Sequence, residues 1–230
     1  MKTHKNTARI FSVLLTAGLC ASLPGLLRAA GEAGAAAPNQ APGASAQAAV
    51  LKTTLEDVQK AFTLEMNAKI RYETWAAQAD VETNKSASAL LRAAALSESI
   101  HAAKHADMLK KRGVTQMPKE DLRPVVKSTR ENLEAALKSA QDDAALYPAF
   151  IKQAEESGRS DIIMSLKGAA ASTESHVKLF GQAVKEFAAW KKGEAKSFAV
   201  CQVCGFTMME PAPKTCPICS APEDKFTIVK

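Results

Sequence analysis

Aromatic side chains are scarce in this sequence. Its 230 residues include two tryptophans and two tyrosines, and aromatic residues make up only 5% of the chain. This scarcity argues against an aromatic-rich β architecture, and the abundance of Ala, Lys, Leu and Glu is typical of a helical protein.

The sequence also lacks a strong excess of charge. The formal net charge is +6, but the first 30 residues carry four basic side chains and no acidic one, so that +2 is left for the rest. The remaining basic residues are interspersed with acidic ones instead of being clustered. We therefore expect no nucleic-acid partner.

The N-terminus predicts a secretory signal peptide over residues 1–30. Basic residues come first, an apolar stretch runs from Ile10 to about Leu27, and small residues then offer a cleavage site. An uncleaved membrane anchor is the alternative, since this stretch could nearly span a bilayer. Residues 31–50 are rich in Ala, Gly, Pro, Gln and Ser and predict a flexible linker. We therefore expect an exported, periplasmic protein.

Between residues 51 and 192, apolar residues recur at intervals of three and four, which predicts amphipathic helices. Four long helices are expected, over 53–82, 85–112, 128–157 and 160–191. A longer connection with two prolines joins the second helix to the third. This pattern predicts an all-α, ferritin-like four-helix bundle.

Several polar side chains fall on the apolar faces of these helices. They are Glu65 on the first helix, Glu98, His101 and His105 on the second, Asp143 on the third and His176 on the fourth. A buried carboxylate is costly unless it is paired or bound to a metal. Carboxylates and imidazoles on facing helices are how bundles build dinuclear metal sites, so the pattern predicts a metal site. A buried Glu–His hydrogen-bond network without metal is the alternative.

Cysteine is also scarce, and its placement predicts a second metal site within residues 193–230. Two C-x-x-C pairs, separated by 11 residues, consist of Cys201, Cys204, Cys216 and Cys219. Two such pairs can surround zinc or a single iron with four thiolates. Removal of the signal peptide would remove Cys20 and leave no spare cysteine. Two disulfides are the alternative in an exported protein, but Gly205 and Pro217 within the motif favour metal.

A helical bundle followed by a "C-x-x-C-G … C-P-x-C" module resembles the rubrerythrin family over residues 50–230. The stretch "AFTLEMNAKIRYETWAAQA" is similar to the family's first ligand helix, and "ESIH" matches the Glu-x-x-His of its second. "NLEAAL" with "YPAF" and "HVKLF" are similar to the third and fourth helices, and the terminal module resembles the rubredoxin domain. The resemblance implies that the bundle binds iron through Glu65, Glu98, His101 and His176, and that the four cysteines bind one further iron.

Two positions depart from the family pattern. Thr173 stands where the fourth helix of the family carries the Glu of Glu-x-x-His. The family also has two glutamates three residues apart on the third helix, where this chain offers Ser139 or Ala140 and then Asp142 or Asp143. Helical periodicity favours Asp143 as the ligand. A modified dinuclear site, a mononuclear site and an inactive remnant all remain open.

The resemblance implies a non-haem iron oxidoreductase that reduces hydrogen peroxide. Electrons would enter at the cysteine-bound iron and pass to one or two irons in the bundle. Tyr72, Tyr147 and His105 are expected next to the ligands. The resemblance also implies a homodimer, because the family's cysteine domain commonly reaches the bundle of a partner subunit. An exported protein would need an electron donor in the cell envelope.

Two other hypotheses fit the sequence. In one, the bundle is a degenerate, inactive scaffold for dimerisation and the cysteine module carries electrons. In the other, the cysteines hold a structural zinc and the bundle binds or sequesters metal. Thr173 and the altered third helix favour the first of these two hypotheses.

Overall fold

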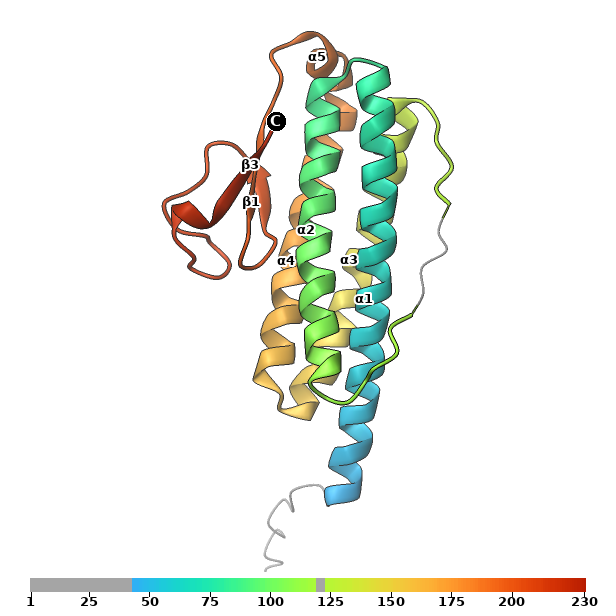
Figure 1. Ribbon diagram of the computed structural model, residues 1–230, viewed down its shortest axis with the longest axis vertical. Helices are drawn as coiled ribbons and strands as arrows, with labels where there is room; N and C mark the ends of the chain where they lie inside the picture. Colours follow the sequence, from blue (N-terminus) through green and yellow to red (C-terminus); the bar gives the residue numbers. More distant parts are fainter. Residues whose placement is uncertain (1–42, 119–122) are drawn as a thin grey trace, which may run out of the picture. The chain divides into compact units, whose positions relative to one another are not determined.

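A bundle of long helices precedes a small antiparallel sheet in the computed structural model, which describes residues 43–118 and 123–230 (Figure 1). The helices are α1 (Ala44–Val81), α2 (Lys85–Lys110), α3 (Thr129–Ser157), α4 (Ser160–Lys185) and α5 (Phe187–Lys192). The strands are β1 (Phe198–Cys201), β2 (Thr207–Met209) and β3 (Phe226–Val229). This architecture confirms the predicted fold class. The predicted signal peptide lies outside the described residues, as does the predicted linker up to residue 42.

Local capping chemistry sets several of the helix ends. The side chain of Asn84 accepts a hydrogen bond from the backbone N–H of Ala87 at the start of α2. Ser128 and Glu131 form a reciprocal capping box at the start of α3. Gly158 ends α3 in the left-handed conformation, with φ of 65°, which glycine adopts without steric penalty.

Two helix boundaries differ from the sequence prediction. α1 begins at Ala44, inside the segment 31–50 that composition predicts to be a linker. Its first turns are mostly alanine, which favours helix strongly without showing any apolar periodicity. The predicted helix 160–191 is divided at Glu186 into α4 and α5. The division allows Trp190 of α5 to pack against Phe198 of β1, with ring centroids 6.0 Å apart.

The four long helices pack in two main pairs, α1 along α2 and α3 along α4. α3 begins at the end of the bundle opposite to the end where α2 finishes, so the connection between them must cross its full length (Figure 1). The indole N–H of Trp75 on α1 donates a hydrogen bond to the carbonyl of Val125 in this connection, at 3.0 Å. The predicted crossover between the second and third helices is therefore present.

Two apolar clusters fill the bundle, and a polar layer lies between them. Along α1, Phe62 belongs to one cluster and Ala68 to the other, with Glu65 between them. Along α2, Glu98 and His101 lie between Ala95 of one cluster and Ala102 of the other. Along α4, Thr173 and His176 lie between Ala169 and Leu179, which also belong to different clusters. The helices therefore bring their polar residues to one level of the bundle.

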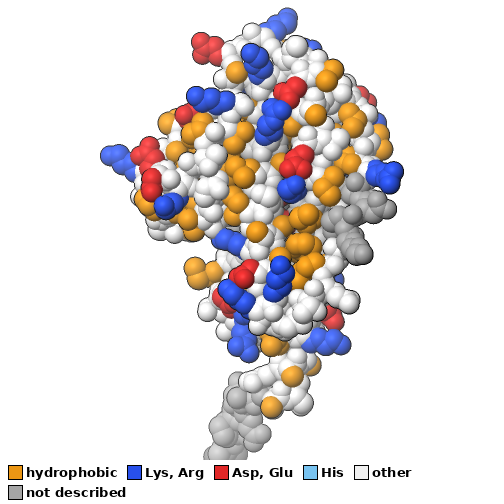
Figure 2. All heavy atoms as spheres, viewed as in Figure 1, with side chains coloured by type: hydrophobic (Ala, Val, Ile, Leu, Met, Phe, Trp, Pro, Cys, Tyr) orange, Lys and Arg blue, Asp and Glu red, His pale blue; other side chains and the backbone are white. Residues whose placement is uncertain are grey.

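The sheet has the strand order β2-β1-β3, with both pairs antiparallel. Phe198, Ala199 and Val200 of β1 are fully buried, and β1 packs against α2. Positive and negative side chains are interspersed on the face shown in Figure 2. Within the described residues, no helix is both long enough and apolar enough to cross a membrane.

Candidate metal centres

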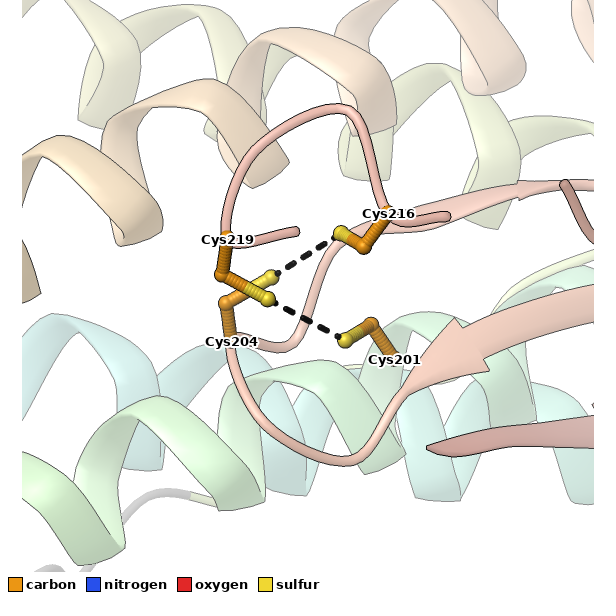
Figure 3. A group of neighbouring side chains, drawn as sticks. All are labelled: Cys201, Cys204, Cys216 and Cys219. Atoms are coloured by element: carbon orange, nitrogen blue, oxygen red, sulfur yellow. Dashed lines mark hydrogen bonds between the residues drawn. The ribbon is translucent and has the colours of Figure 1, made fainter. Parts of the chain in front are cut away.

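The four cysteines converge at the tip of the sheet module (Figure 3). The sulfurs of Cys201 and Cys219 are 3.7 Å apart, and those of Cys204 and Cys216 are 3.6 Å apart. A disulfide requires about 2.0 Å, so all four are free thiols. Sulfurs about 2.3 Å from a metal at the centre of a tetrahedron are separated by about 3.8 Å. The observed spacing therefore fits a tetrahedral metal site.

The surroundings of the thiols also favour a bound cation. Burial raises the pKa of the Cys204 thiol and, less strongly, that of Cys201. Thiolates at these positions need a positive charge nearby, because deprotonation is otherwise unfavourable. The chemistry of the four donors suits iron or zinc.

In the bundle, three of the predicted ligands form one compact group. Single ligand atoms of Glu65, Glu98 and His101 all lie within 4.8 Å of one another, and all three side chains are buried. His101 Nδ1 is 3.0 Å from Oε2 of Glu65 and 3.2 Å from Oε2 of Glu98. Two carboxylates and one imidazole nitrogen therefore point at the same small volume.

The buried charges in this group shift the pKa values strongly. Burial opposes a charge on His101, but the carboxylates of Glu65 and Glu98 outweigh it and raise the pKa of His101 to about 10. Burial and the nearby Glu98 raise the pKa of Glu65 well above its usual value. Burial also acts to raise the pKa of Glu98, but its hydrogen bonds and the nearby histidines lower it overall. In the metal-free protein, bound protons would balance the negative charge of the Glu65 and Glu98 carboxylates. In the metal-bound protein, the cation could balance this charge instead.

His176 approaches the other oxygen of Glu98. Its Nδ1 lies 3.1 Å from Oε1 of Glu98, yet this nitrogen makes no hydrogen bond to any described residue. On its far side, Nε2 lies 3.3 Å from the hydroxyl of Thr207, which itself donates to the carbonyl of Gly205. The Thr207 oxygen can therefore accept Nε2–H, so that Nδ1 is the nitrogen of His176 that faces the carboxylate of Glu98. A metal cation could bind both Nδ1 of His176 and Oε1 of Glu98, so the pair fits a metal position.

The cysteine module also fixes the orientation of His101. Nε2 of His101 lies 2.9 Å from the backbone carbonyl of Cys204, so Nε2 is the donor and Nδ1 is directed to Glu65 and Glu98. Gly205 permits this approach, because a Cβ there would lie 2.3 Å from His101 Nε2, and its φ of +80° also favours glycine. The two candidate metal centres are thus joined by one hydrogen bond.

The opposite wall of the bundle site carries fewer carboxylates than the family pattern implies. A cavity of about 10 Å³ is lined there by Thr173, Asp143 and Ala140, together with Glu65, Glu98 and other side chains. The hydroxyl of Thr173 donates to the carbonyl of Ala169 and offers no charge to the cavity.

Asp143 faces the bundle, as the helical periodicity predicts, while the neighbouring Asp142 is exposed and pairs with Lys138. The structure nevertheless leaves Asp143 outside the compact ligand group. Its carboxylate lies 4.0 Å from the guanidinium of Arg71, which also donates to Ser139. Burial raises the pKa of Asp143 to about 6. Asp143 is therefore a cavity-wall residue in this structure.

The three residues expected beside the ligands are all buried. The Tyr147 hydroxyl donates to Oε1 of Glu65, and Tyr72 lines the cavity with its ring edge-on to that of His176. His105 Nε2 lies 3.8 Å from Oε1 of Glu65. The sequence pattern did not identify Arg71 or Thr207 as site residues, because neither belongs to a ligand motif and each is brought to the site by tertiary packing.

Together, a ferritin-like bundle with a buried carboxylate–imidazole layer and a four-thiol module define a two-centre, non-haem metalloprotein. The sequence model of the rubrerythrin family matches residues 56–187, and that of the rubrerythrin rubredoxin-like domain matches residues 200–227. The chain belongs to the rubrerythrin family, and it is a non-haem iron protein of the rubrerythrin type.

Individual relatives agree with this assignment. Rubrerythrin-1 of Clostridium acetobutylicum is 30% identical over 185 residues, covering 76% of this chain and 94% of that protein. Rubrerythrin-2 of the same organism is 28% identical over 183 residues, covering 75% and 95%. A mixed-valence structure of nigerythrin superposes with a TM-score of 0.69 at 25% identity, covering 76% of this chain and 86% of that one.

The raised pKa of His101 predicts a pH-dependent contribution to stability. In the metal-free protein, a histidine with a folded pKa of about 10 stabilises fully below its unfolded pKa of about 6.5, and this stabilisation is lost as the pH rises towards 10. The stability of the wild type relative to a His101→Gln variant should therefore fall by roughly 1 kcal/mol per pH unit between pH 7 and 9. Urea unfolding of both proteins, with chelator and reductant, measures this difference. A difference that grows with pH would contradict the assigned charge state.

Removal of the Thr207 hydroxyl should weaken metal binding at His176. In a Thr207→Val variant, Nε2–H of His176 loses its acceptor and the ring loses its orientation, so the affinity of the bundle for metal should fall about tenfold. Thr227→Val, an exposed change in the same sheet, is the matched control and should leave the affinity unchanged. Calorimetric titration with Zn²⁺ of protein whose cysteine site is already filled measures both. Equal affinities in the two variants would show that Thr207 does not position His176.

Proposed function

We propose that this protein is an oxidoreductase that transfers electrons from the four-cysteine centre to the bundle centre, where hydrogen peroxide is reduced to water. The observation that carries the proposal is that Cys204 contacts both candidate metal centres. Its thiol belongs to the cysteine centre, and its carbonyl accepts a hydrogen bond from His101, whose other nitrogen faces Glu65 and Glu98. One residue and one imidazole ring thus connect the two centres.

The residues around the cavity suit a very small polar substrate. The cavity of about 10 Å³ is no larger than one water molecule requires, so it excludes organic substrates, and H₂O₂ would enter it with a small displacement of the surrounding side chains. Tyr72 and Tyr147 line it, and burial raises the pKa of both hydroxyls, so each keeps its proton. Tyr147 Oη already donates to Glu65, which places a proton donor at the edge of the cavity.

Iron bound at the two centres would supply the two electrons that, with two protons, convert one H₂O₂ to two waters. The chain would contribute the remaining conditions. Glu65, Glu98, His101 and His176 would hold the bundle metal, and the contacts from Cys204 and Thr207 would orient the two imidazoles. The apolar clusters on either side of the layer would limit access of bulk water.

Location and partners follow from the sequence as part of this proposal. The chain would be exported to the periplasm, act as a homodimer and receive electrons from a donor in the cell envelope. Within the described residues, the cysteine module already contacts the bundle of its own chain. Electron transfer within one subunit is thus compatible with the proposal, whichever subunits associate.

Peroxide should oxidise the reduced cysteine centre only through the bundle. In anaerobically reduced, iron-loaded wild-type protein, one equivalent of H₂O₂ should rapidly restore the visible absorbance of the oxidised four-cysteine iron. In a Glu98→Gln variant the rate should fall at least about 100-fold, because the shared carboxylate of the bundle ligands is lost. Stopped-flow absorbance measures both rates.

Glu73→Gln is the matched control for that experiment, because Glu73 is an exposed residue on α1 and should leave the rate unchanged. Equally fast oxidation in the wild type and in Glu98→Gln would show that peroxide reacts directly at the cysteine centre and would refute the proposed route. Colourless protein that carries zinc alone would exclude both peroxide reduction and electron transfer by this chain.

A second candidate function is electron transfer with an inactive bundle, favoured by the side chains on the altered wall. Thr173 offers no carboxylate, and Arg71 lies close to Asp143. If these features make the bundle inactive, Thr173→Glu should raise the iron bound in the bundle towards two ions per chain and give a rate of peroxide reduction at least about tenfold above the residual rate of the wild type. Thr173→Gln, which has the same length without the charge, is the control. Metal analysis and stopped-flow absorbance measure the outcome, and unchanged iron content would show that Thr173 does not limit the site.

A further inference from the structure

His105 is the buried polar residue of the layer for which the proposed electron route has no use. Its side chain is fully buried, and neither ring nitrogen makes a hydrogen bond to any described residue. A neutral imidazole has one N–H and one lone pair, and leaving both unmatched in an apolar core is unfavourable.

The carboxylate of Glu65 lies close to His105. Nε2 of His105 lies 3.8 Å from Oε1 of Glu65, which is too long for a hydrogen bond. The other oxygen of Glu65, Oε2, lies 3.0 Å from Nδ1 of His101. His101 and His105 are one helical turn apart on α2 and share a face, so Glu65 presents one oxygen to each ring.

A metal ion fits the gap between His105 and Glu65 where a direct hydrogen bond does not. Bonds of about 2.1 Å from a metal to nitrogen and to oxygen can span any separation up to about 4.2 Å. The observed 3.8 Å lies within this range. A metal would also take up the lone pair that no described residue satisfies.

We propose that His105 is a metal ligand, binding through Nε2 an ion that it shares with Glu65. This inference rests on the proposed function only in that the bundle holds a metal. His105 would partly replace the carboxylates that Thr173 and the third helix do not supply. Imidazole is neutral where a carboxylate is anionic, so the exchange favours a divalent ion such as Fe²⁺ over a trivalent one.

The test compares His105→Leu with Met108→Leu, a buried control one turn further along α2. Anaerobic titration with Fe²⁺, using protein whose four-cysteine site is already filled, measures the affinity of the bundle. His105→Leu should bind Fe²⁺ at least about tenfold more weakly than the wild type, and Met108→Leu should bind it equally well. Equal affinity in His105→Leu and the wild type would overturn the proposal.

Thermal unfolding is a second test, in which the effect of His105→Leu on the melting temperature should differ between metal-free and Fe²⁺-loaded protein. In metal-free protein, His105→Leu should raise the melting temperature, because it replaces an unmatched polar ring by an apolar side chain. In the presence of Fe²⁺, it should reduce the increase in melting temperature that the metal gives to the wild type. A variant whose increase with Fe²⁺ equals that of the wild type would contradict ligation by His105.

A measurement on the wild type keeps the proposal testable if the variant does not fold. Pulsed EPR of the nitric oxide adduct of the Fe²⁺ protein should show nitrogen couplings from an additional imidazole beyond those of His101 and His176. Couplings from only those two rings would overturn the proposal. If His105→Leu loses Fe²⁺ binding but the wild type does not consume peroxide, the proposed function is refuted and the role of His105 stands. If His105→Leu binds Fe²⁺ as the wild type does and the wild type consumes peroxide, the role of His105 is refuted and the proposed function stands.

Discussion

The buried carboxylates of Glu65 and Glu98 require positive charge, and the rest of the site is arranged around this requirement. Both carboxylates are almost fully buried, and each faces at least one histidine ring. Nδ1 of His101 faces both carboxylates, and its Nε2 donates a hydrogen bond to the Cys204 carbonyl. The same ring that balances charge in the bundle therefore also contacts the cysteine module, and its hydrogen bond to Cys204 links the two candidate metal centres.

The cysteine module contributes more to the bundle than an additional metal centre. Its backbone and its Thr207 hydroxyl contact the outer nitrogens of His101 and His176, so that the inner nitrogens of both rings face the carboxylates. Ser172 of α4 donates to the Gly205 carbonyl and adds a third buried polar contact between the module and the bundle. This arrangement makes metal affinity in the bundle dependent on how the module packs against it.

The two sides of the bundle site differ in chemistry. The side formed by α1 and α2 is rich in donors, since Glu65, Glu98, His101 and His105 lie there. The side formed by α3 and α4 offers His176, a threonine hydroxyl that is already engaged, and an aspartate near an arginine. A metal would therefore be held mainly by α1 and α2, which are also the most closely packed pair of helices.

Much of the candidate site was predictable, because helical periodicity assigns a residue to a face without knowledge of the fold. It assigned Glu65, Glu98, His101 and His176 to the interior and preferred Asp143 to Asp142, and the burial pattern agrees. It did not predict the guanidinium of Arg71 beside Asp143, because an interaction between α1 and α3 depends on their packing. The alanine-rich start of α1 also escaped prediction, since an exposed helix needs no apolar periodicity.

The sequence by itself determined the class of fold, the four thiols of the cysteine module and the polar face of α2, because these depend on spacing within short segments. Only the tertiary structure decided which nitrogen of each histidine faces the carboxylates, which oxygen of Glu98 each ring approaches, and that Glu65 lies between His101 and His105. The physical reason is distance along the chain. His101 and Cys204 are separated by 103 positions, and their hydrogen bond exists only because the sheet module packs against the bundle.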